Sequence, residues 1–187
     1  MIVLGIDPGI ANTGYGVVAS SGSRLRALAF GVIETAAELA PEARLAEIHA
    51  DVGALIAGHG VEEVAVEDLY FGANVVSAMA VGQARGVVML AAGQHGVPVQ
   101  AHTPQAVKSA VCGSGRAGKD QVARMVARLL GLSAPPRPDH AADALAVALC
   151  AINRAPLASA IAKVGVRGPA VVAHGREGEF PAAEVSL

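Results

Sequence analysis

The segment Ile2-Val3-Leu4-Gly5-Ile6-Asp7 opens the chain with an apolar run that ends directly at a carboxylate. A short apolar run rich in β-branched residues predicts a buried strand. A second run, Val64-Ala65-Val66, leads into Glu67 in the same way. If the two strands are parallel neighbours, about 4.8 Å apart, both acids lie in one crevice at the carboxyl ends of the strands. Open α/β sheets bind their ligands in such a crevice.

A third acid, Asp143, falls in the first turn of an Ala-rich stretch that predicts a helix. Carboxylates are costly to gather at the edge of a core unless cations compensate them. Oxygen ligands with few Cys or His residues nearby are what Mg²⁺ or Mn²⁺ prefers. An Asp before Pro8-Gly9 also suits a simple turn. The matching position of Glu67 nevertheless favours a divalent-cation site that includes Asp7, Glu67 and Asp143.

The pattern along the chain predicts a mixed α/β sheet of five strands with helices on both faces. We expect strands at residues 2–7, 15–19, 24–34, 62–67 and 97–101, with turns at residues 12–14 and 21–23. We expect helices at residues 41–58, 74–94, 104–112, 119–130 and 139–153. Residues 1–156 are then one domain. Residues 157–187 are predicted to be a flexible tail, because the periodicity fades into Gly, Pro and Ala.

The composition limits the class of protein. Hydrophobic residues make up 53% of the chain and aromatic residues 3%, so the core must consist of Ala, Val, Leu and Ile. We find no apolar run of the ~18 residues that a membrane span needs, and no basic flank of an export signal. Cys112 and Cys150 match no metal-ligand spacing, which favours free thiols in a reducing compartment. We therefore expect a cytoplasmic protein.

Charge is distributed unevenly along the chain. The net charge is −2, which by itself argues against a polyanionic partner. Residues 102–138, however, hold six basic side chains and one acidic side chain, so the excess of acids lies elsewhere. A locally basic and otherwise acidic chain is typical of a protein that holds a polyanion on one face.

Several short motifs occur in a fixed order between residue 2 and about residue 153. They are Gly5-Ile6-Asp7-Pro8-Gly9, Thr13-Gly14-Tyr15-Gly16-Val17, Val66-Glu67, Gly82-Gln83-Ala84-Arg85-Gly86-Val87 and Ala141-Ala142-Asp143-Ala144-Leu145-Ala146. In this order and spacing they resemble the RuvC-type Holliday-junction resolvases. The resemblance implies a ribonuclease-H-like fold and a homodimer that cuts four-way DNA junctions with Mg²⁺ or Mn²⁺. It also implies cooperation with the RuvA–RuvB branch-migration complex.

By this resemblance, Asp7, Glu67 and Asp143 are catalytic metal ligands. The family usually presents Asp-x-x-Asp on its last helix, whereas here His140 stands three residues before Asp143. We interpret His140 as a ligand or a proton carrier, and a neutral imidazole there favours Mn²⁺ somewhat. Asp139 shares the helix face at spacing four, but it also suits the N-cap. Two ions roughly 3.5–4 Å apart would serve an in-line displacement that leaves a 5′-phosphate and a 3′-hydroxyl.

A further set of residues is predicted to bind DNA: Tyr70, Phe71, Lys108, Arg116, Lys119 and Arg124. The two aromatics could stack on bases of an opened junction, or fold back over the core. Lys108 and Lys119 match positions where the family keeps basic residues. The alternative for Lys108, Arg124 and Arg128 is an ordinary solvated helix face.

The segment Gly113–Lys119 satisfies G-x-x-x-x-G-K, the pattern of a nucleotide-binding loop. Such a loop continues with Ser or Thr, where this chain has Asp120, and it follows a strand rather than a predicted helix. We interpret the segment as a flexible loop that carries Arg116 and Lys119 to DNA phosphates.

Gly82 and Gly86 lie four residues apart on a predicted helix. Gly is costly in a helix interior, so close approach of another backbone is expected there, either the sheet or a second subunit. The sequence thus predicts a structure-selective DNA endonuclease of recombination and repair. The alternatives are a non-catalytic junction-binding protein, which could have lost the acids, and an actin- or sugar-kinase-like ATP-binding domain. The latter needs a second lobe, for which 187 residues leave no room.

Overall fold

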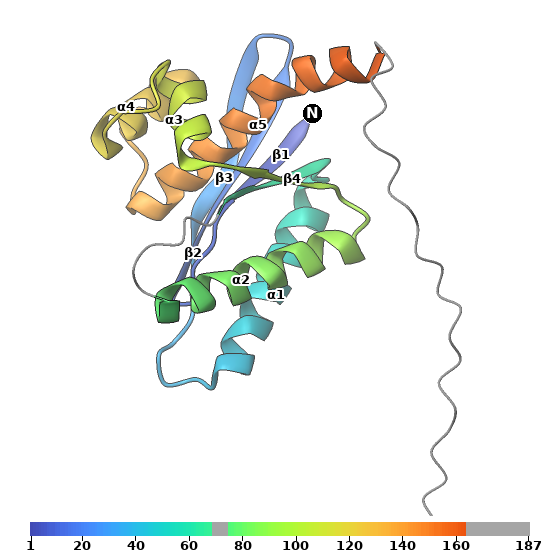
Figure 1. The fold of residues 1–187 in the computed structure, drawn as a ribbon, viewed down its shortest axis with the longest axis vertical. Coiled ribbons are helices and arrows are strands. Elements are labelled where there is room, and N and C mark those ends of the chain that lie inside the picture. Colours follow the sequence, from blue (N-terminus) through green and yellow to red (C-terminus); the bar gives the residue numbers. More distant parts are fainter. Residues whose placement is uncertain (69–74, 164–187) are drawn as a thin grey trace, which may run out of the picture.

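A five-stranded sheet with the order β3-β2-β1-β4-β5 lies at the centre of the molecule (Figure 1). The computed structural model describes residues 1–68 and 75–163. The strands are β1 Ile2–Asp7, β2 Asn12–Ser21, β3 Arg24–Glu34, β4 Glu63–Glu67 and β5 Val99–His102. β1, β2 and β3 pair antiparallel, whereas β1 pairs with β4, and β4 with β5, in parallel. The predicted mixed sheet is therefore confirmed.

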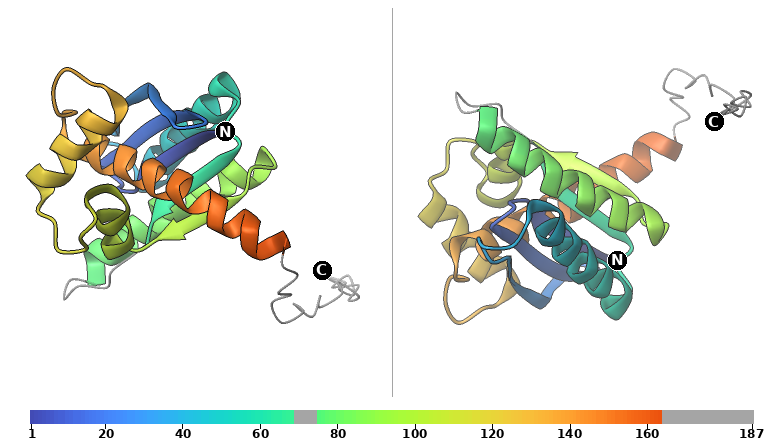
Figure 2. Two further views of the ribbon diagram at one scale, coloured as in Figure 1. Left: turned by 90° about the horizontal axis from the view of Figure 1, so that it is seen from above. Right: turned by 90° about the horizontal axis from the view of Figure 1, so that it is seen from below.

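Helices cover both faces of this sheet (Figure 2). One face carries α1 Pro41–His59 and α2 Val75–Gln94. The other face carries α3 Pro104–Cys112, α4 Lys119–Leu130 and α5 Asp139–Lys163. Each face has its own buried apolar cluster, because successive strand residues point to opposite sides. Over the described ranges, none of these helices combines the length and the apolarity that a membrane span requires.

Several predicted boundaries differ from the structure by one or more residues, and three of the differences have a clear physical reason. β2 begins at Asn12 rather than at residue 15, because Asn12 already pairs with Glu34 on β3. β5 ends at His102, one residue later than predicted, because His102 pairs with Glu67. α5 runs to Lys163 instead of ending near residue 153, since Ala-rich sequence sustains a helix without amphipathic periodicity. The helix thus enters the predicted tail, whose residues 164–187 lie outside the described part of the chain.

The alternation of side chains along β1 decides where its carboxylate points. Val3 packs in the cluster beneath α5, and Leu4 and Ile6 pack in the cluster beneath α1 and α2. Asp7 therefore lies on the α5 face. The parallel register matches Ile6 with Val66, so Asp7 and Glu67 lie level at the carboxyl ends of β1 and β4. The predicted parallel neighbourhood of the two strands is confirmed.

Three glycines let α5 lie directly on the backbones of β1 and β2. A methyl group on Gly5 would overlap the carbonyl oxygen of Ala144, and one on Gly14 would overlap that of His140. A methyl group on Gly16 would come within 2.7 Å of the Leu145 side chain. Because these obstacles include the helix backbone, no side-chain rotation could relieve them. The glycines thus bring the first turns of α5 onto the carboxyl end of β1.

Candidate active site

Four side chains predicted as metal ligands line one cavity at the carboxyl ends of β1 and β4. The cavity has a volume of about 300 Å³, and its polar lining residues are Asp7, Glu67, Lys108, Lys119, His140 and Asp143. These side chains come from β1, β4, α3, α4 and α5, so the cavity exists only in the folded sheet. Two of the cations predicted to bind DNA lie in it together with the acids.

The loop that follows β1 is held by hydrogen bonds on both sides. Thr13 Oγ1 donates to the carbonyl oxygen of Gly9 over 2.6 Å, and Thr35 Oγ1 donates to that of Ile10 over 2.5 Å. The Arg44 guanidinium donates to Thr35 Oγ1 over 2.8 Å and to the Ile10 carbonyl over 3.3 Å. This network fixes the chain immediately after the end of β1, which limits where the carboxylate of Asp7 can lie.

The first turn of α5 separates the roles of its two candidate ligands. His140 Nδ1 lies 2.7 Å from Asp7 Oδ2, inside the cavity. Asp139 instead accepts a hydrogen bond of 2.8 Å from Arg137 Nη1 and lines a neighbouring cavity. Asp139 is also the first residue of α5 itself, so its observed contact is with Arg137 and not the predicted cap of the first-turn amides. Of these two side chains, His140 is therefore the one that contacts Asp7 and is the better candidate for a ligand beside it.

A lysine compensates the third carboxylate. Lys119 Nζ lies 3.4 Å from Asp143 Oδ2, and this neighbouring carboxylate raises the pKa of Lys119. The Lys119 side chain is 73% exposed, so solvent weakens the pair and the ammonium group can turn to another anion. The first residue of α4 thus brings to the cavity a cation that Asp143 does not hold firmly.

The electrostatics show that the acids share one poorly solvated space. Burial, together with the nearby Asp7 and Asp143 carboxylates, raises the pKa of Glu67 to about 7, against the opposing effect of Lys119 and Lys108. Burial also raises the pKa of Asp7, although its hydrogen bond with His140 acts in the opposite direction. The negative charge of this cluster is therefore only partly offset by the protein's own cations.

The chemical nature of these side chains suits a divalent cation, although in this structure they are not arranged as a coordination shell. Within residues 1–68 and 75–163, no group of three His, Cys, Asp or Glu side chains is placed to hold a metal ion. Instead His140 contacts Asp7 and Lys119 contacts Asp143. Three carboxylates and an imidazole in one cavity, with a pKa of about 7 at Glu67, nevertheless form a donor set that a divalent cation would stabilise.

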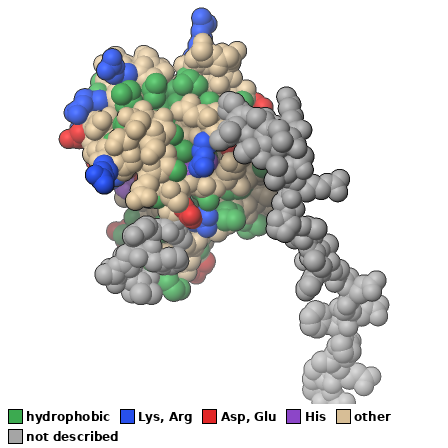
Figure 3. All heavy atoms as spheres, turned by 45° about the horizontal axis from the view of Figure 1, so that its top comes forward, with side chains coloured by type: hydrophobic (Ala, Val, Ile, Leu, Met, Phe, Trp, Pro, Cys, Tyr) green, Lys and Arg blue, Asp and Glu red, His purple; other side chains and the backbone are tan. Residues whose placement is uncertain are grey.

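The remaining residues predicted to bind DNA lie in different places. Tyr70 and Phe71 fall outside the described residues. Arg116 is exposed on the segment between α3 and α4, and Arg124 lines the neighbouring cavity. Figure 3 shows Lys and Arg side chains along the left edge of the view, over α3 and α4. The predicted helix before the G-x-x-x-x-G-K segment is confirmed as α3, so the segment lacks the strand that a nucleotide loop needs.

The sequence interpretation overlooked a buried histidine beside the site. His102 pairs in register with Glu67, so both side chains lie on the α5 face. It is 2% exposed, and among the described residues neither ring nitrogen has a hydrogen-bond partner. Burial lowers the pKa of His102, and the nearby Arg154 acts in the same direction. The alternation of residues along β5 was the available signal, once the strand is known to extend to this position.

Comparison with known proteins gives a consistent result. A family model described as "Crossover junction endodeoxyribonuclease RuvC" matches residues 3–151. A protein of that name from Moorella thermoacetica is 53% identical over 156 residues, which cover 83% of this chain and 93% of the relative. The Thermus thermophilus RuvC structure is 43% identical with a TM-score of 0.80, over 84% of this chain and 97% of that one. T. thermophilus RuvC in complex with Holliday junction substrate is 42% identical with a TM-score of 0.81, over 85% and 97%.

We expect Glu67→Gln to stabilise the metal-free protein near pH 8 and to have little effect near pH 5. The folded-state pKa of about 7 lies above the ordinary value of 4.5. The folded state therefore binds more protons between these two values, and its free energy of unfolding falls as the pH rises through them. Allowing for partial exposure, the gain at the higher pH should be on the order of 1–3 kcal/mol.

Urea denaturation in EDTA at the two pH values measures this difference. Glu47→Gln is the matched control, because Glu47 is exposed on α1, and it should change the unfolding free energy equally little at both. An equal effect of Glu67→Gln at both pH values would contradict the proposed burial of an ionised Glu67.

Proposed function

The chain belongs to the family of crossover junction endodeoxyribonuclease RuvC, and on that basis we propose that it resolves Holliday junctions. It is a structure-selective DNA endonuclease that hydrolyses phosphodiester bonds in paired cuts during recombination and repair. The observation that carries this function is the cavity in which Asp7, Glu67, His140 and Asp143 meet. The Holliday junction complex of the Thermus relative supports a four-way DNA junction as the substrate.

The residues of the cavity divide the chemistry among them. Asp7, Glu67 and Asp143, with His140, would hold divalent ions, either Mg²⁺ or Mn²⁺ and two per site. When bound, these ions would lower the pKa of the attacking water and stabilise charge on the phosphate and on the leaving 3′-oxygen. Lys119 and Lys108 place their ammonium groups at the same cavity, where they would bind and orient the scissile phosphate.

His140 has a role that follows from its hydrogen bond. Its Nδ1 faces Asp7 Oδ2, which fixes the ring and leaves Nε2 directed elsewhere. The side chain is roughly half exposed, so Nε2 can either join the ligand set or exchange a proton with solvent. Hydrolysis in line with the leaving 3′-oxygen gives a 5′-phosphate and a 3′-hydroxyl.

The two alternative functions have less support from the site. A junction-binding protein without activity would need the cations of α3 and α4. It would gain nothing from three neighbouring carboxylates, whose partial burial costs free energy. An ATP-binding domain would require a phosphate-binding loop, and the segment with that pattern follows a helix here.

We expect Asp7→Asn to abolish the symmetric nicking of a synthetic four-way junction. The rate should fall by roughly two to three orders of magnitude, the scale seen when one electrostatic group of a catalytic site is removed. Binding should stay intact or tighten, because the substitution removes a negative charge that faces the DNA. Gel assays of nicking and of complex formation measure the two effects separately.

Asp51→Asn on α1 is the matched control, since it removes the same charge on the opposite face of the sheet. It should leave cleavage unchanged. Cleavage retained by Asp7→Asn would refute the assignment of Asp7 as a metal ligand.

The homodimer is a further part of the proposal, and the outer face of α2 supports it. Met79 and Leu90 are 62% and 54% exposed, which is unusual for large apolar side chains on one helix. Apart from its own helix backbone, a methyl group on Gly86 would meet no atom of the described residues within 4 Å. Gly86 therefore faces away from the sheet. Of the two partners expected to approach the glycine pair, the sheet or a second subunit, this position favours the second subunit. A two-fold dimer would place two cavities on opposing strands of a junction.

We expect the double substitution Met79→Glu and Leu90→Glu to yield monomers, because it places charges in the proposed apolar interface. Sedimentation equilibrium measures the mass. Leu129→Glu on α4 is the control, since Leu129 is exposed and lies on the other face of the sheet. A wild-type protein that sediments as a monomer at micromolar concentration would contradict the dimer. Cooperation with RuvA–RuvB stays a prediction.

A further inference from the structure

A second cavity adjoins the active cavity and shares two residues with it. It also has a volume of about 300 Å³, and it lies between α4, the start of α5 and the connector that joins them. Lys119 and Asp143 line both cavities, so their ion pair forms the boundary between the two. A DNA strand with one phosphate in the active cavity could therefore continue past this pair into the second cavity.

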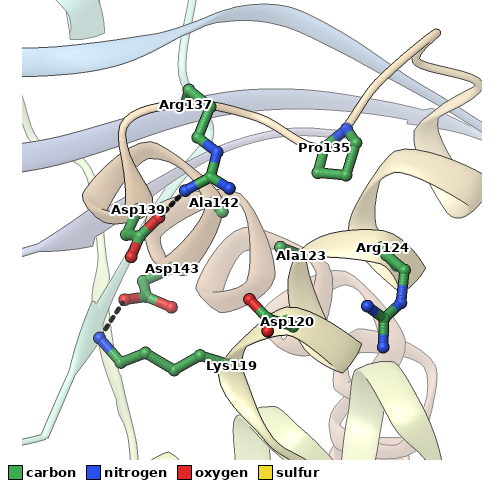
Figure 4. A pocket seen from close by; sticks show the side chains of 9 residues that line it. All are labelled: Lys119, Asp120, Ala123, Arg124, Pro135, Arg137, Asp139, Ala142 and Asp143. Atoms are coloured by element: carbon green, nitrogen blue, oxygen red, sulfur yellow. Dashed lines mark hydrogen bonds and ion pairs between the residues drawn. The ribbon is translucent and has the colours of Figure 1, made fainter.

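Two guanidinium groups of the second cavity are available to a ligand (Figure 4). Arg124 is exposed on α4 and has no hydrogen bond or ion pair with any residue in the described part of the chain. Arg137 contacts Asp139 through Nη1 alone, and its side chain is largely exposed. A guanidinium carries five N–H donors and matches a phosphate with two parallel hydrogen bonds. Both arginines therefore retain donors for a phosphate oxygen.

The acids of the cavity restrict what kind of anion it can bind. Asp139 is paired with Arg137, and Asp143 with Lys119, while Asp120 also lines the wall. Three acids thus balance the three basic residues in formal charge, so the cavity has no net positive charge to attract a free anion. A phosphate that is covalently joined to one already held next door would arrive at a high effective concentration. The cavity therefore suits a neighbouring phosphodiester better than free phosphate.

We propose that Arg124 and Arg137 bind the phosphate next to the scissile one on the cleaved DNA strand. This inference rests on the proposed function and deepens it, since it assigns the path of the cleaved strand from the active cavity across the Lys119–Asp143 pair to α4. Arg137, one of the six basic residues between positions 102 and 138, is thereby assigned as a DNA-binding residue. Arg124 keeps its predicted role and gains a specific ligand.

A double-mutant cycle between the protein and the DNA backbone tests this directly. Every protein in the cycle is the full chain with Asp7→Asn, so that bound junctions are not cut. The junction has one uncharged methylphosphonate on either the 5′ or the 3′ side of the scissile phosphate, after the wild type has mapped the cut. At one of these two positions the methylphosphonate should weaken binding by about tenfold in the parent, and by less than about twofold once Arg124→Ala and Arg137→Ala are added.

The salt dependence of binding gives a second readout. The pair of substitutions should reduce the slope of log affinity against log salt concentration by about 0.9, as expected for one lost phosphate contact. Arg128→Ala is the matched control, because Arg128 lies on the same helix, is exposed, and lines neither cavity. It should keep the full tenfold effect of the methylphosphonate.

The outcomes separate this inference from the proposed function. If the methylphosphonate effects at both positions persist in the Arg124→Ala and Arg137→Ala protein, the second cavity does not bind the neighbouring phosphate. If Arg128→Ala removes the effect equally, the contact is not specific to the cavity and the inference also fails. If the Asp7→Asn parent does not bind the unmodified junction, the proposed function itself fails.

Discussion

The close packing of α5 on the glycines of β1 and β2 is the constraint on which the site depends. Gly5, Gly14 and Gly16 leave no room for a side chain beneath the helix. The helix backbone therefore rests on the strand backbones, and its first turn reaches the carboxyl end of β1. This position brings His140 within hydrogen-bonding distance of Asp7, although 133 residues separate them in the chain. A sheet with side chains at the same places would hold α5 farther away and would separate the acids.

This packing places the carboxyl groups of the site where burial and mutual repulsion disfavour their charged forms. Asp7 and Glu67 lie where burial raises the pKa of both carboxyl groups, and Asp143 adds to the repulsion at Glu67. The partners that the structure places beside these acids are the imidazole of His140 and the ammonium groups of Lys119 and Lys108. On the proposed function, a divalent cation bound there would relieve the repulsion among these carboxylates. Perturbed carboxyl groups in a cavity are typical of functional sites for that reason.

Much of this arrangement could be predicted from the sequence, because it follows from strand periodicity. Two apolar runs that end in acids placed Asp7 and Glu67 at one edge of the sheet, and the parallel pairing agrees. His140 is favoured over Asp139 from the sequence, but the spacing alone could not decide between them, since spacings of three and four share a helix face. In the structure Asp139 contacts Arg137 nearby in the chain, whereas His140 contacts Asp7, and that second contact exists only in the folded protein. His102 and the second cavity were missed for a similar reason, as both require elements that meet only in three dimensions.

The most direct test of the account is the position of Mn²⁺ in crystals of the protein, from anomalous scattering. The account predicts anomalous density in the active cavity, within coordination distance of Asp7, Glu67 and Asp143, with Lys119 displaced from Asp143. Density at another site, or carboxylates that remain apart with the Lys119–Asp143 pair intact at saturating Mn²⁺, would contradict it.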